Sequence, residues 1–367
     1  MIEEAPYLEA WYRRHLLLAS VDISSSGVEP YTFGEVRRLA GIAHEAFDAL
    51  LLEDSLTLGA PPLREALASR YAGGDVGRVL VTHGSSEAIF LVMGSLLGPR
   101  DNVAVLAPVY HSLRRYVELS GAAISELPLR SVREAQDDWA RLIPERTTCV
   151  VVNFPHNPTG YAPTPEGMLA LKRRCSEIGA WLILDAAFEE LPMAQRSVRL
   201  EYEPGERVVR FGTLSKAFGL PGLRVGWCIA PPQVLQLTLA VRDRTTLFLS
   251  PLVEAVATRV VLAADNFIEP RVQRARYNLG IVERWIGTEC KHASWNRPAG
   301  GVCGLVRLLG YPDTQAFCLK LLQRRGVILV PGRAFDEPGC VRLGFGGDTA
   351  SLVAGLEAVS QVLRSRH

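Results

Sequence analysis

The chain has 367 residues, more than one hydrophobic core usually organises, so a large domain with a smaller partner is expected. Hydrophobic residues make up 48% and charged residues 22%, a composition typical of a globular protein that excludes extended disorder. Forty basic and thirty-nine acidic residues leave a formal charge of +1, so no overall field attracts nucleic acid or an anionic membrane. We therefore expect small molecules, or a second copy of the chain, as partners.

Short β-branched runs alternate with segments of helical period, the pattern of strand-helix units around a mostly parallel sheet. The expected strands, in chain order, are 78–82, 103–106, 149–153, 181–185, 208–211 and 226–230. Helices are expected between them, for example over 86–97 and 166–178. The fold class is therefore α/β, with a large ligand-binding domain over residues 46–265.

The pattern changes after about residue 266. A charged helical stretch is followed by "GGVCGLVRL", by a helix in "DTQAFCLKLLQRRG", and then by "VILVPGRAF" and "CVRLGFG". This order predicts a smaller domain of antiparallel strands covered by helices over residues 266–367. Residues 1–45 are assigned to an N-terminal arm that also forms part of the smaller domain.

The cysteines and the hydrophobic runs indicate a cytoplasmic protein. Seven cysteines lack the paired spacing of a zinc site, and their odd number argues against a disulfide framework. The first twenty residues lack the basic region and apolar core of a signal peptide. The rest of the sequence contains no stretch of roughly 20 apolar residues, which is the length that spans a bilayer. We expect neither a membrane segment nor a metal site.

Small and polar residues follow several expected strands, at the edge where an open parallel sheet binds ligands. The turn "HGSSEA" places Gly84, Ser85 and Ser86 at the start of a helix, where N–H groups and hydroxyls suit a phosphate. Tyr110, in "APVYHS", offers a flat aromatic face. Taken singly, such a turn is more often a helix cap, and such a tyrosine is more often a core or rim aromatic side chain.

Three further residues are spaced by about one strand-helix unit. Asn157 lies in "NFPHNPTG", Asp185 ends an apolar strand 28 residues later, and Lys216 follows after another 31. Lys216 and Arg224 lie in "FGTLSKAFGLPGLRVG", among small and apolar residues where a solvated lysine would have charged neighbours. An amine, a carboxylate, an amide, an aromatic face and a phosphate cradle together fit pyridoxal 5′-phosphate (PLP).

These motifs resemble the fold-type I PLP enzymes of the class I/II aminotransferase group over nearly the whole chain. The resemblance rests on "SKAFGLPGLRVGW", on "NPTG", on the aspartate that ends a strand, and on a late arginine in "RLGF". It implies a mostly parallel seven-stranded sheet in the large domain, a smaller α+β domain, and a homodimer with residues of both chains around each cofactor.

The resemblance also implies a role for each site residue. Lys216 would hold the cofactor covalently and move protons, Asp185 would pair with the pyridinium nitrogen, and Asn157 would donate to the ring phenolate oxygen. Tyr110 would stack on the ring, and Arg342 would bind the substrate α-carboxylate with its planar fork. The residues assigned to the phosphate are Gly84, Ser85, Ser86, Thr213 and Arg224.

Two departures from the aminotransferase pattern bear on the reaction. The family usually has a tyrosine three residues after the strand-terminal aspartate, whereas "DAAF" has Phe188 there. The change removes a hydrogen bond to the cofactor ring in a low-dielectric site. A tyrosine common before the glycine of "DSLTLGAPPLRE", which reaches the neighbouring subunit's phosphate, is also absent. Both departures weigh against generic transamination.

A narrower resemblance is to capreomycidine synthase and its relatives, PLP enzymes that close a guanidine ring on a hydroxylated arginine in antibiotic pathways. It rests on "DISSSGVEPYTFGE", "THGSSEA", "VVNFPHNPTG", "DAAF" and "FGTLSKAFGLPGLRVGWC". The "DISSSG" block is absent from ordinary aminotransferases; Ser25 and Gly27 would contact substrate, or the block would order against a dimer partner. Asp22 and Glu29 are candidates to bind the guanidinium, or else they cap a helix or meet solvent.

Three functions remain open at this point. A cyclase would expel the β-hydroxyl as water, add a guanidine nitrogen to Cβ and return a proton to Cα through Lys216. An ordinary aminotransferase would instead need a 2-oxo acid. A non-catalytic PLP-fold regulator would carry a DNA-binding region, and the sequence has no basic helix-turn-helix segment.

Overall fold

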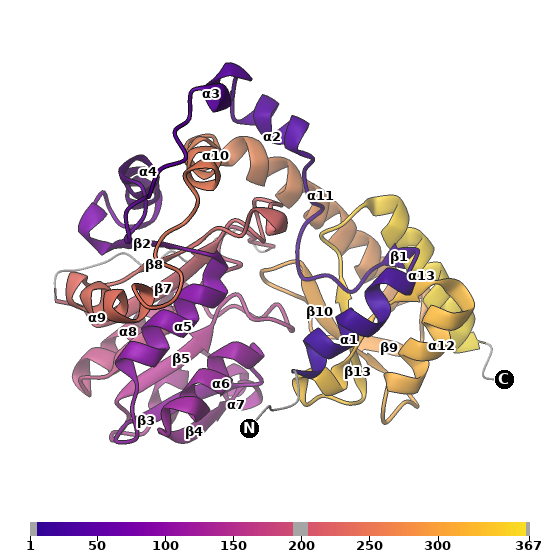
Figure 1. Cartoon of the computed structure of the whole chain (residues 1–367). Helices are drawn as coiled ribbons and strands as arrows, with labels where there is room; N and C mark the ends of the chain where they lie inside the picture. The colour runs from indigo at the N-terminus through magenta and orange to yellow at the C-terminus, as the bar shows by residue number, and fades with distance from the viewer. Residues whose placement is uncertain (1–5, 194–204, 365–367) are drawn as a thin grey trace.

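A seven-stranded sheet forms the centre of the larger of two lobes in the computed structural model, which describes residues 6–193 and 205–364 (Figure 1). Its strands are β2 (Val79–Thr82), β3 (Asn102–Ala107), β4 (Ala123–Pro128), β5 (Cys149–Asn153), β6 (Trp181–Asp185), β7 (Val208–Thr213) and β8 (Gly226–Ile229). In space they run β2-β8-β7-β6-β5-β3-β4. Strand β8 is antiparallel to both β2 and β7, and the other neighbours are parallel.

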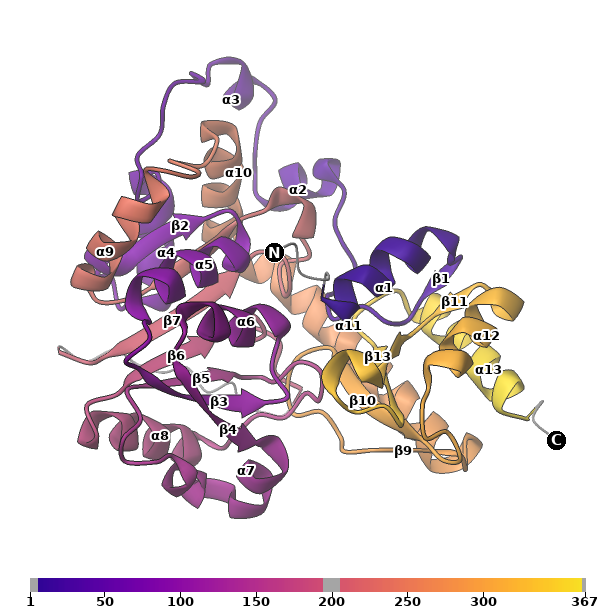
Figure 2. The same ribbon diagram turned by 60° about the horizontal axis from the view of Figure 1, so that its bottom comes forward.

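Helices cover both faces of this sheet because alternate residues of a strand point to opposite sides. The helices of this lobe are α4 (Pro61–Tyr71), α5 (Gly84–Leu96), α6 (His111–Ser120), α7 (Leu129–Ala135), α8 (Pro165–Glu177), α9 (Pro232–Arg242) and α10 (Pro251–Leu262). Val103 and Val105 of β3 pack in the cluster that includes α5, α6 and α9. Ala104 and Leu106 pack on the other face with α7 and α8, and Figure 2 shows these two layers on either side of the sheet.

The smaller lobe is built on a four-stranded antiparallel sheet in the order β12-β13-β10-β9. Its strands are β9 (Ala293–Trp295), β10 (Cys303–Leu308), β12 (Val330–Pro331) and β13 (Cys340–Gly344), and its helices are α12 (Gln315–Arg325) and α13 (Thr349–Arg364). The long helix α11 (Ala264–Arg284) runs from the larger lobe to the smaller one (Figure 1).

The N-terminal arm lies on the smaller lobe before the chain crosses to the larger one (Figure 1). Its short strand β1 (Val21–Asp22) pairs in parallel with β11 (Val327–Ile328). Helix α1 (Tyr7–His15) is anchored by Trp11, which is buried and donates from Nε1 to the Leu329 carbonyl oxygen at 3.0 Å. The chain then passes through α2 (Phe33–Leu39) and α3 (Glu45–Asp48) to α4.

The α/β class, the mostly parallel seven-stranded sheet and the smaller α+β part are confirmed. Strands β5 and β6 have the predicted bounds, and the other predicted strands differ by one or two residues at one end or at both. Strand β4 was not predicted, because it is an edge strand whose buried position is Leu127 and it therefore lacks an apolar run. The domain boundaries at residues 45 and 265 stay predictions.

Two further observations concern membranes and metals. Within residues 6–193 and 205–364, no helix has both the length and the apolar composition that a membrane span requires. The same residues contain no group of three or more His, Cys, Asp or Glu side chains arranged to hold a metal ion.

Candidate active site

A cavity of about 840 Å³ gathers the residues that the sequence placed at strand ends. It is lined by the ends of β5, β6 and β7, by Arg342 of β13 and by the N-terminal arm. Of the residues assigned from the sequence, those that line it are Asp22, Ser25, Gly27, Glu29, Ser85, Ser86, Tyr110, Asn157, Asp185, Phe188, Thr213, Lys216, Arg224 and Arg342. The structure therefore brings them together, while their individual roles stay predictions.

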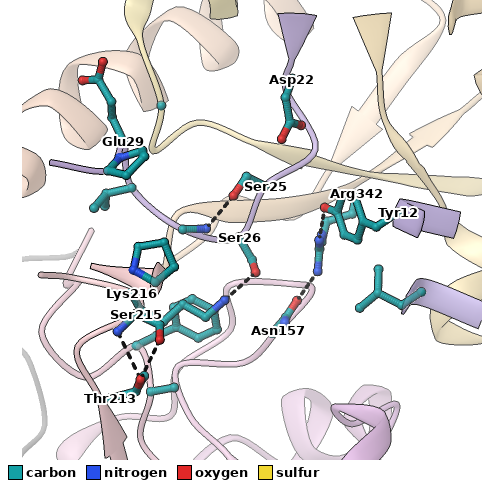
Figure 3. A pocket seen from close by; sticks show the side chains of 18 of the residues that line it. Tyr12, Asp22, Ser25, Ser26, Glu29, Asn157, Thr213, Ser215, Lys216 and Arg342 are labelled. Atoms are coloured by element: carbon teal, nitrogen blue, oxygen red, sulfur yellow. Dashed lines mark hydrogen bonds between the residues drawn. The ribbon is translucent and has the colours of Figure 1, made fainter. Parts of the chain in front are cut away.

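Lys216 projects into this cavity from the turn that follows β7. Its Nζ donates a hydrogen bond to Ser26 Oγ at 3.0 Å (Figure 3). The same Nζ lies 5.3 Å from the centre of the Phe188 ring. Burial, together with the positive charge of Arg342, lowers the pKa of Lys216 to about 8. A lysine with this pKa is partly neutral near physiological pH, as a nucleophile or a base must be.

Asp185 ends β6 and is 5% exposed. Its Oδ1 accepts a hydrogen bond from Ala187 N at 3.0 Å, and burial raises its pKa to about 6. Among the described residues, no lysine or arginine forms an ion pair with this carboxylate. Because an unpaired buried carboxylate is costly, the site fits a ligand that brings a cationic group, such as a protonated pyridine nitrogen.

Asn153 links the ends of two strands through hydrogen bonds, and it was not predicted from the sequence. Its side-chain amide donates to the Asp185 carbonyl oxygen at 3.0 Å, and its Oδ1 accepts from Asn157 N at 2.8 Å. Asn153 ends strand β5 as Asp185 ends β6. The same rule about strand ends would therefore have identified it.

The start of α5 forms an anion cradle with Arg224. The helix has no side-chain cap at His83, which leaves N–H groups of its first turn free of a capping side chain. A Cβ at Gly84 would lie 2.5 Å from a guanidinium nitrogen of Arg224, so the arginine crosses the helix start closely. A cation beside the positive end of a helix is unfavourable unless an anion lies between them. This arrangement fits a phosphate.

Two hydroxyls extend the cradle. Ser215 Oγ lies 3.0 Å from Thr213 Oγ1 (Figure 3). It also accepts a hydrogen bond from Arg224 Nη1 at 3.3 Å. Thr213 Oγ1 also accepts from Ser215 N at 3.1 Å and donates to the Val225 carbonyl oxygen. Ser215 was not predicted, although it lies beside Lys216 in the quoted motif.

Arg342 is 2% exposed and has only neutral partners among the described residues. Its Nε donates to the Ser24 carbonyl oxygen at 3.1 Å, its Nη1 to Asn157 Oδ1 at 3.2 Å, and its Nη2 to the Tyr12 hydroxyl at 2.7 Å (Figure 3). A buried guanidinium without an anionic partner is suited to bind a carboxylate from a ligand.

Two aromatic side chains complete the walls. Tyr110 precedes α6, and its burial raises the pKa of the phenol, which keeps the hydroxyl neutral. Phe188 is 2% exposed and presents its ring to Lys216. The position where aminotransferases usually carry a tyrosine hydroxyl is thus apolar here.

The two carboxylates proposed to bind a guanidinium have other partners. Glu29 forms ion pairs with Arg271 at 2.9 Å and with Arg274, and it points away from Lys216 in Figure 3. Asp22 Oδ1 accepts hydrogen bonds from Ser24 N at 2.7 Å and from its hydroxyl at 2.6 Å. Both carboxylates are thus engaged by other groups of the protein, and their binding of a guanidinium stays a prediction. Ser25 Oγ similarly accepts a local hydrogen bond from Gly27 N at 3.1 Å.

Comparison with known proteins now identifies the family. Residues 55–359 match the model for the aminotransferase class I and II family, so the chain belongs to it and is an enzyme of the aminotransferase fold. The chain is 41% identical to capreomycidine synthase of Streptomyces vinaceus, over 97% of this chain and 93% of that protein.

Two further relatives extend this comparison. The crystal structure of the PLP-dependent cyclase OrfR has 46% identity and a TM-score of 0.95, covering 100% of this chain and 99% of that one. The arginine–pyruvate transaminase AruH of Pseudomonas aeruginosa is 30% identical, over 89% of this chain and 85% of that protein. The family resemblance seen in the sequence is therefore confirmed.

Proposed function

We propose that this protein is a PLP-dependent cyclase that acts on a hydroxylated arginine. It would expel the β-hydroxyl as water and close a ring through a guanidine nitrogen. The observation that carries the proposal is the surroundings of Lys216, whose Nζ is bound by Ser26 of the "DISSSG" block and faces the ring of Phe188. Both features separate this chain from the aminotransferase pattern, and the likeness to capreomycidine synthase and to the cyclase OrfR supports the same conclusion.

The residues of the cavity fit the cofactor. Lys216 would hold it covalently, Asp185 would pair with its ring nitrogen, and Tyr110 would stack on the ring. The phosphate would lie among Arg224, the first turn of α5, Thr213 and Ser215. When bound, PLP supplies an electron sink that stabilises negative charge at the substrate Cα.

The side chains of this protein would then position substrate and move protons. Arg342 binds the α-carboxylate through its planar fork and so sets Cα near Lys216. The Lys216 amine, whose pKa is about 8, takes the Cα proton, and the Ser26 hydroxyl holds that amine in place. The Cβ–O bond breaks, and the oxygen leaves as water with the proton that the guanidine nitrogen gives up when it bonds to Cβ.

The second half of the reaction restores the amino acid. A guanidine nitrogen loses a proton and bonds to Cβ, and Lys216 returns a proton to Cα. The net change is the loss of one water, with no oxidation or reduction. The reaction therefore needs no 2-oxo acid.

The experiment that tests this proposal is anaerobic incubation of the loaded enzyme with β-hydroxyarginine in D2O without any 2-oxo acid. Mass spectrometry should find a product lighter by one water, with one deuterium at Cα. If hydroxyarginines stay unchanged while common amino acids pass their amino group to an added 2-oxo acid, the protein is an aminotransferase. The 30% identity to an arginine–pyruvate transaminase makes L-arginine with pyruvate the natural pair for that comparison.

We further propose that the enzyme is a cytoplasmic homodimer of a natural-product pathway. All seven cysteines are free and buried, which supports a reducing compartment. Leu17, Leu18, Leu51 and Leu52 are each more than two thirds exposed, which supports an apolar contact with a second chain. Sedimentation at low concentration tests the dimer, and a monomer with full activity would contradict it.

A further inference from the structure

Five carboxylates of the described residues line the cavity, and four of them have an evident structural or cofactor role. These are Asp185 at the end of β6, Asp22 with Ser24, Glu29 with Arg271 and Arg274, and Asp348, which accepts a hydrogen bond from Ser351 N at 2.8 Å beside the start of α13. The fifth is Glu9 of helix α1. Glu9 was not predicted, since nothing in the sequence of the arm marks it.

Helix α1 presents Glu9 beside the binding site for the α-carboxylate. Glu9, Tyr12 and Leu16 all line the cavity, and their spacing of three and four residues puts them on one helical face. The Tyr12 hydroxyl accepts a hydrogen bond from Arg342 at 2.7 Å. Glu9 therefore lies about 4.5 Å along the helix axis from the residue that contacts the buried arginine, given a rise of roughly 1.5 Å per residue.

A histidine at the start of helix α6 contacts the Glu9 carboxylate. His111 Nε2 lies 3.3 Å from Glu9 Oε1, and His111 directly follows Tyr110, the proposed ring-stacking residue. Glu9 thus spans the space between the N-terminal arm and the start of α6. Its side chain keeps 46% of its surface exposed, so carboxylate surface remains for a ligand.

The charges around Glu9 favour its ionised form. The hydrogen bond with His111 lowers the pKa of Glu9, and the positive charges of Arg342 and Lys216 add to that effect. The cavity consequently has a cation, Arg342, buried at one place and an anion, Glu9, at another. An amino acid with a carboxylate at one end and a cation at the other is complementary to this pair.

We propose that Glu9 binds the guanidinium of the substrate, held in position by His111, while Arg342 binds the α-carboxylate. This inference rests on the proposed function only for the placement of the α-carboxylate at Arg342. A carboxylate can accept two parallel N–H bonds from a guanidinium, which gives both attraction and orientation. Glu9 is accordingly the residue that selects guanidino amino acids over neutral ones of the same shape.

The test compares the binding of L-arginine and L-citrulline to the cofactor-loaded protein by calorimetry. Citrulline has nearly the shape of arginine but a neutral ureido group, and neither ligand has a β-hydroxyl to expel. The native protein should bind arginine more tightly. Glu9→Gln should weaken arginine binding about tenfold and leave citrulline binding unchanged. The effect on arginine is modest because the Glu9 carboxylate is half exposed, which puts the free energy of its charged hydrogen bond to the guanidinium at the low end of the usual range.

The matched control is Asp348→Asn, which removes another carboxylate of the same cavity. Asparagine serves at a helix start as well as aspartate does, so neither affinity should change. An unchanged citrulline affinity in Glu9→Gln also reports that the site is intact. Equal losses for both ligands, an unchanged arginine affinity, or no preference for arginine in the native protein would each overturn the proposal.

This test separates the Glu9 proposal from the cyclase proposal. If Glu9→Gln keeps the preference for arginine while the native enzyme cyclises β-hydroxyarginine, the assignment of Glu9 is wrong and the cyclase stands. If Glu9→Gln loses the preference while hydroxyarginine remains unchanged, Glu9 binds guanidinium in an enzyme of another activity.

Discussion

Replacing Asp185 with asparagine should stabilise the protein without its cofactor. The Asp185 carboxylate is 5% exposed, and burial raises its pKa from 3.8 to about 6. The shift of about two pKa units corresponds to about 3 kcal/mol at roughly 1.36 kcal/mol per unit, which is the cost of ionising this group in the folded state. Asparagine removes the charge and keeps an oxygen that accepts the hydrogen bond from Ala187 N.

The pH dependence of this effect follows from the direction of the shift. The unfolded carboxyl loses its proton near pH 4 and the folded one near pH 6, so the folded state binds more protons between these values. Through this group, the free energy of unfolding of the native protein decreases from pH 4 to pH 6 and stays lower above pH 6. The advantage of Asp185→Asn should therefore be small at pH 4 and reach about 3 kcal/mol at pH 8.

Urea unfolding followed by circular dichroism at pH 4 and pH 8 measures this advantage on protein stripped of cofactor. Cofactor-loaded protein should show the opposite effect, because the variant lacks the charge proposed to pair with the ring nitrogen and should release PLP faster on dialysis. Asp348→Asn is the control, since that carboxylate is exposed and should give no gain. A variant that is less stable than the native protein at pH 8, or a gain independent of pH, would refute the reasoning.

Four further predictions concern the site. Ser26→Ala should slow the exchange of the L-arginine Cα proton in D2O about tenfold by NMR, because the amine loses a hydrogen bond that holds it; an unchanged rate would contradict this role. Phe188→Tyr should fold normally and shift the pH at which the cofactor absorbance changes, whereas superimposable titration curves would show that the new hydroxyl does not reach the ring. Gly84→Ala, at φ +74° and against Arg224, should lower the affinity for PLP and destabilise the protein by about 1–2 kcal/mol, as titration and thermal melting would show. Borohydride reduction of the loaded enzyme should label Lys216, and a peptide map with the label on another lysine would exclude its proposed role.

The strand-terminal residues of the site could be predicted from the sequence because the fold places them by a simple rule. Strands β5 and β6 are buried on both faces, so their apolar runs mark their ends to the residue. Asn157, Asp185 and Lys216 follow such runs, and parallel strands bring their carboxyl ends to one edge. Strand β4 escaped prediction because it lies at the exposed edge of the sheet.

The contribution of the arm could not be predicted in this way. Tyr12 meets Arg342 across 330 positions of the chain, and Ser26 meets Lys216 across 190. No local period or turn signal encodes such a contact, which depends on β1 pairing with β11. The distinctive "DISSSG" block marked the segment as important, but only the folded chain indicates that Ser26 rather than its neighbour Ser25 bonds the lysine.

The same long-range contacts set the order in which the parts of the site form while the chain is synthesised. The strands from β2 to β8, which carry the proposed cofactor residues, leave the ribosome well before residue 342 has been added. Arg342 must then join Ser24, 318 positions earlier, before the proposed partner of a substrate carboxylate is in place. A nascent chain can thus complete the half that carries the proposed cofactor residues first, and the proposed substrate site around Lys216 is complete only after synthesis has nearly ended.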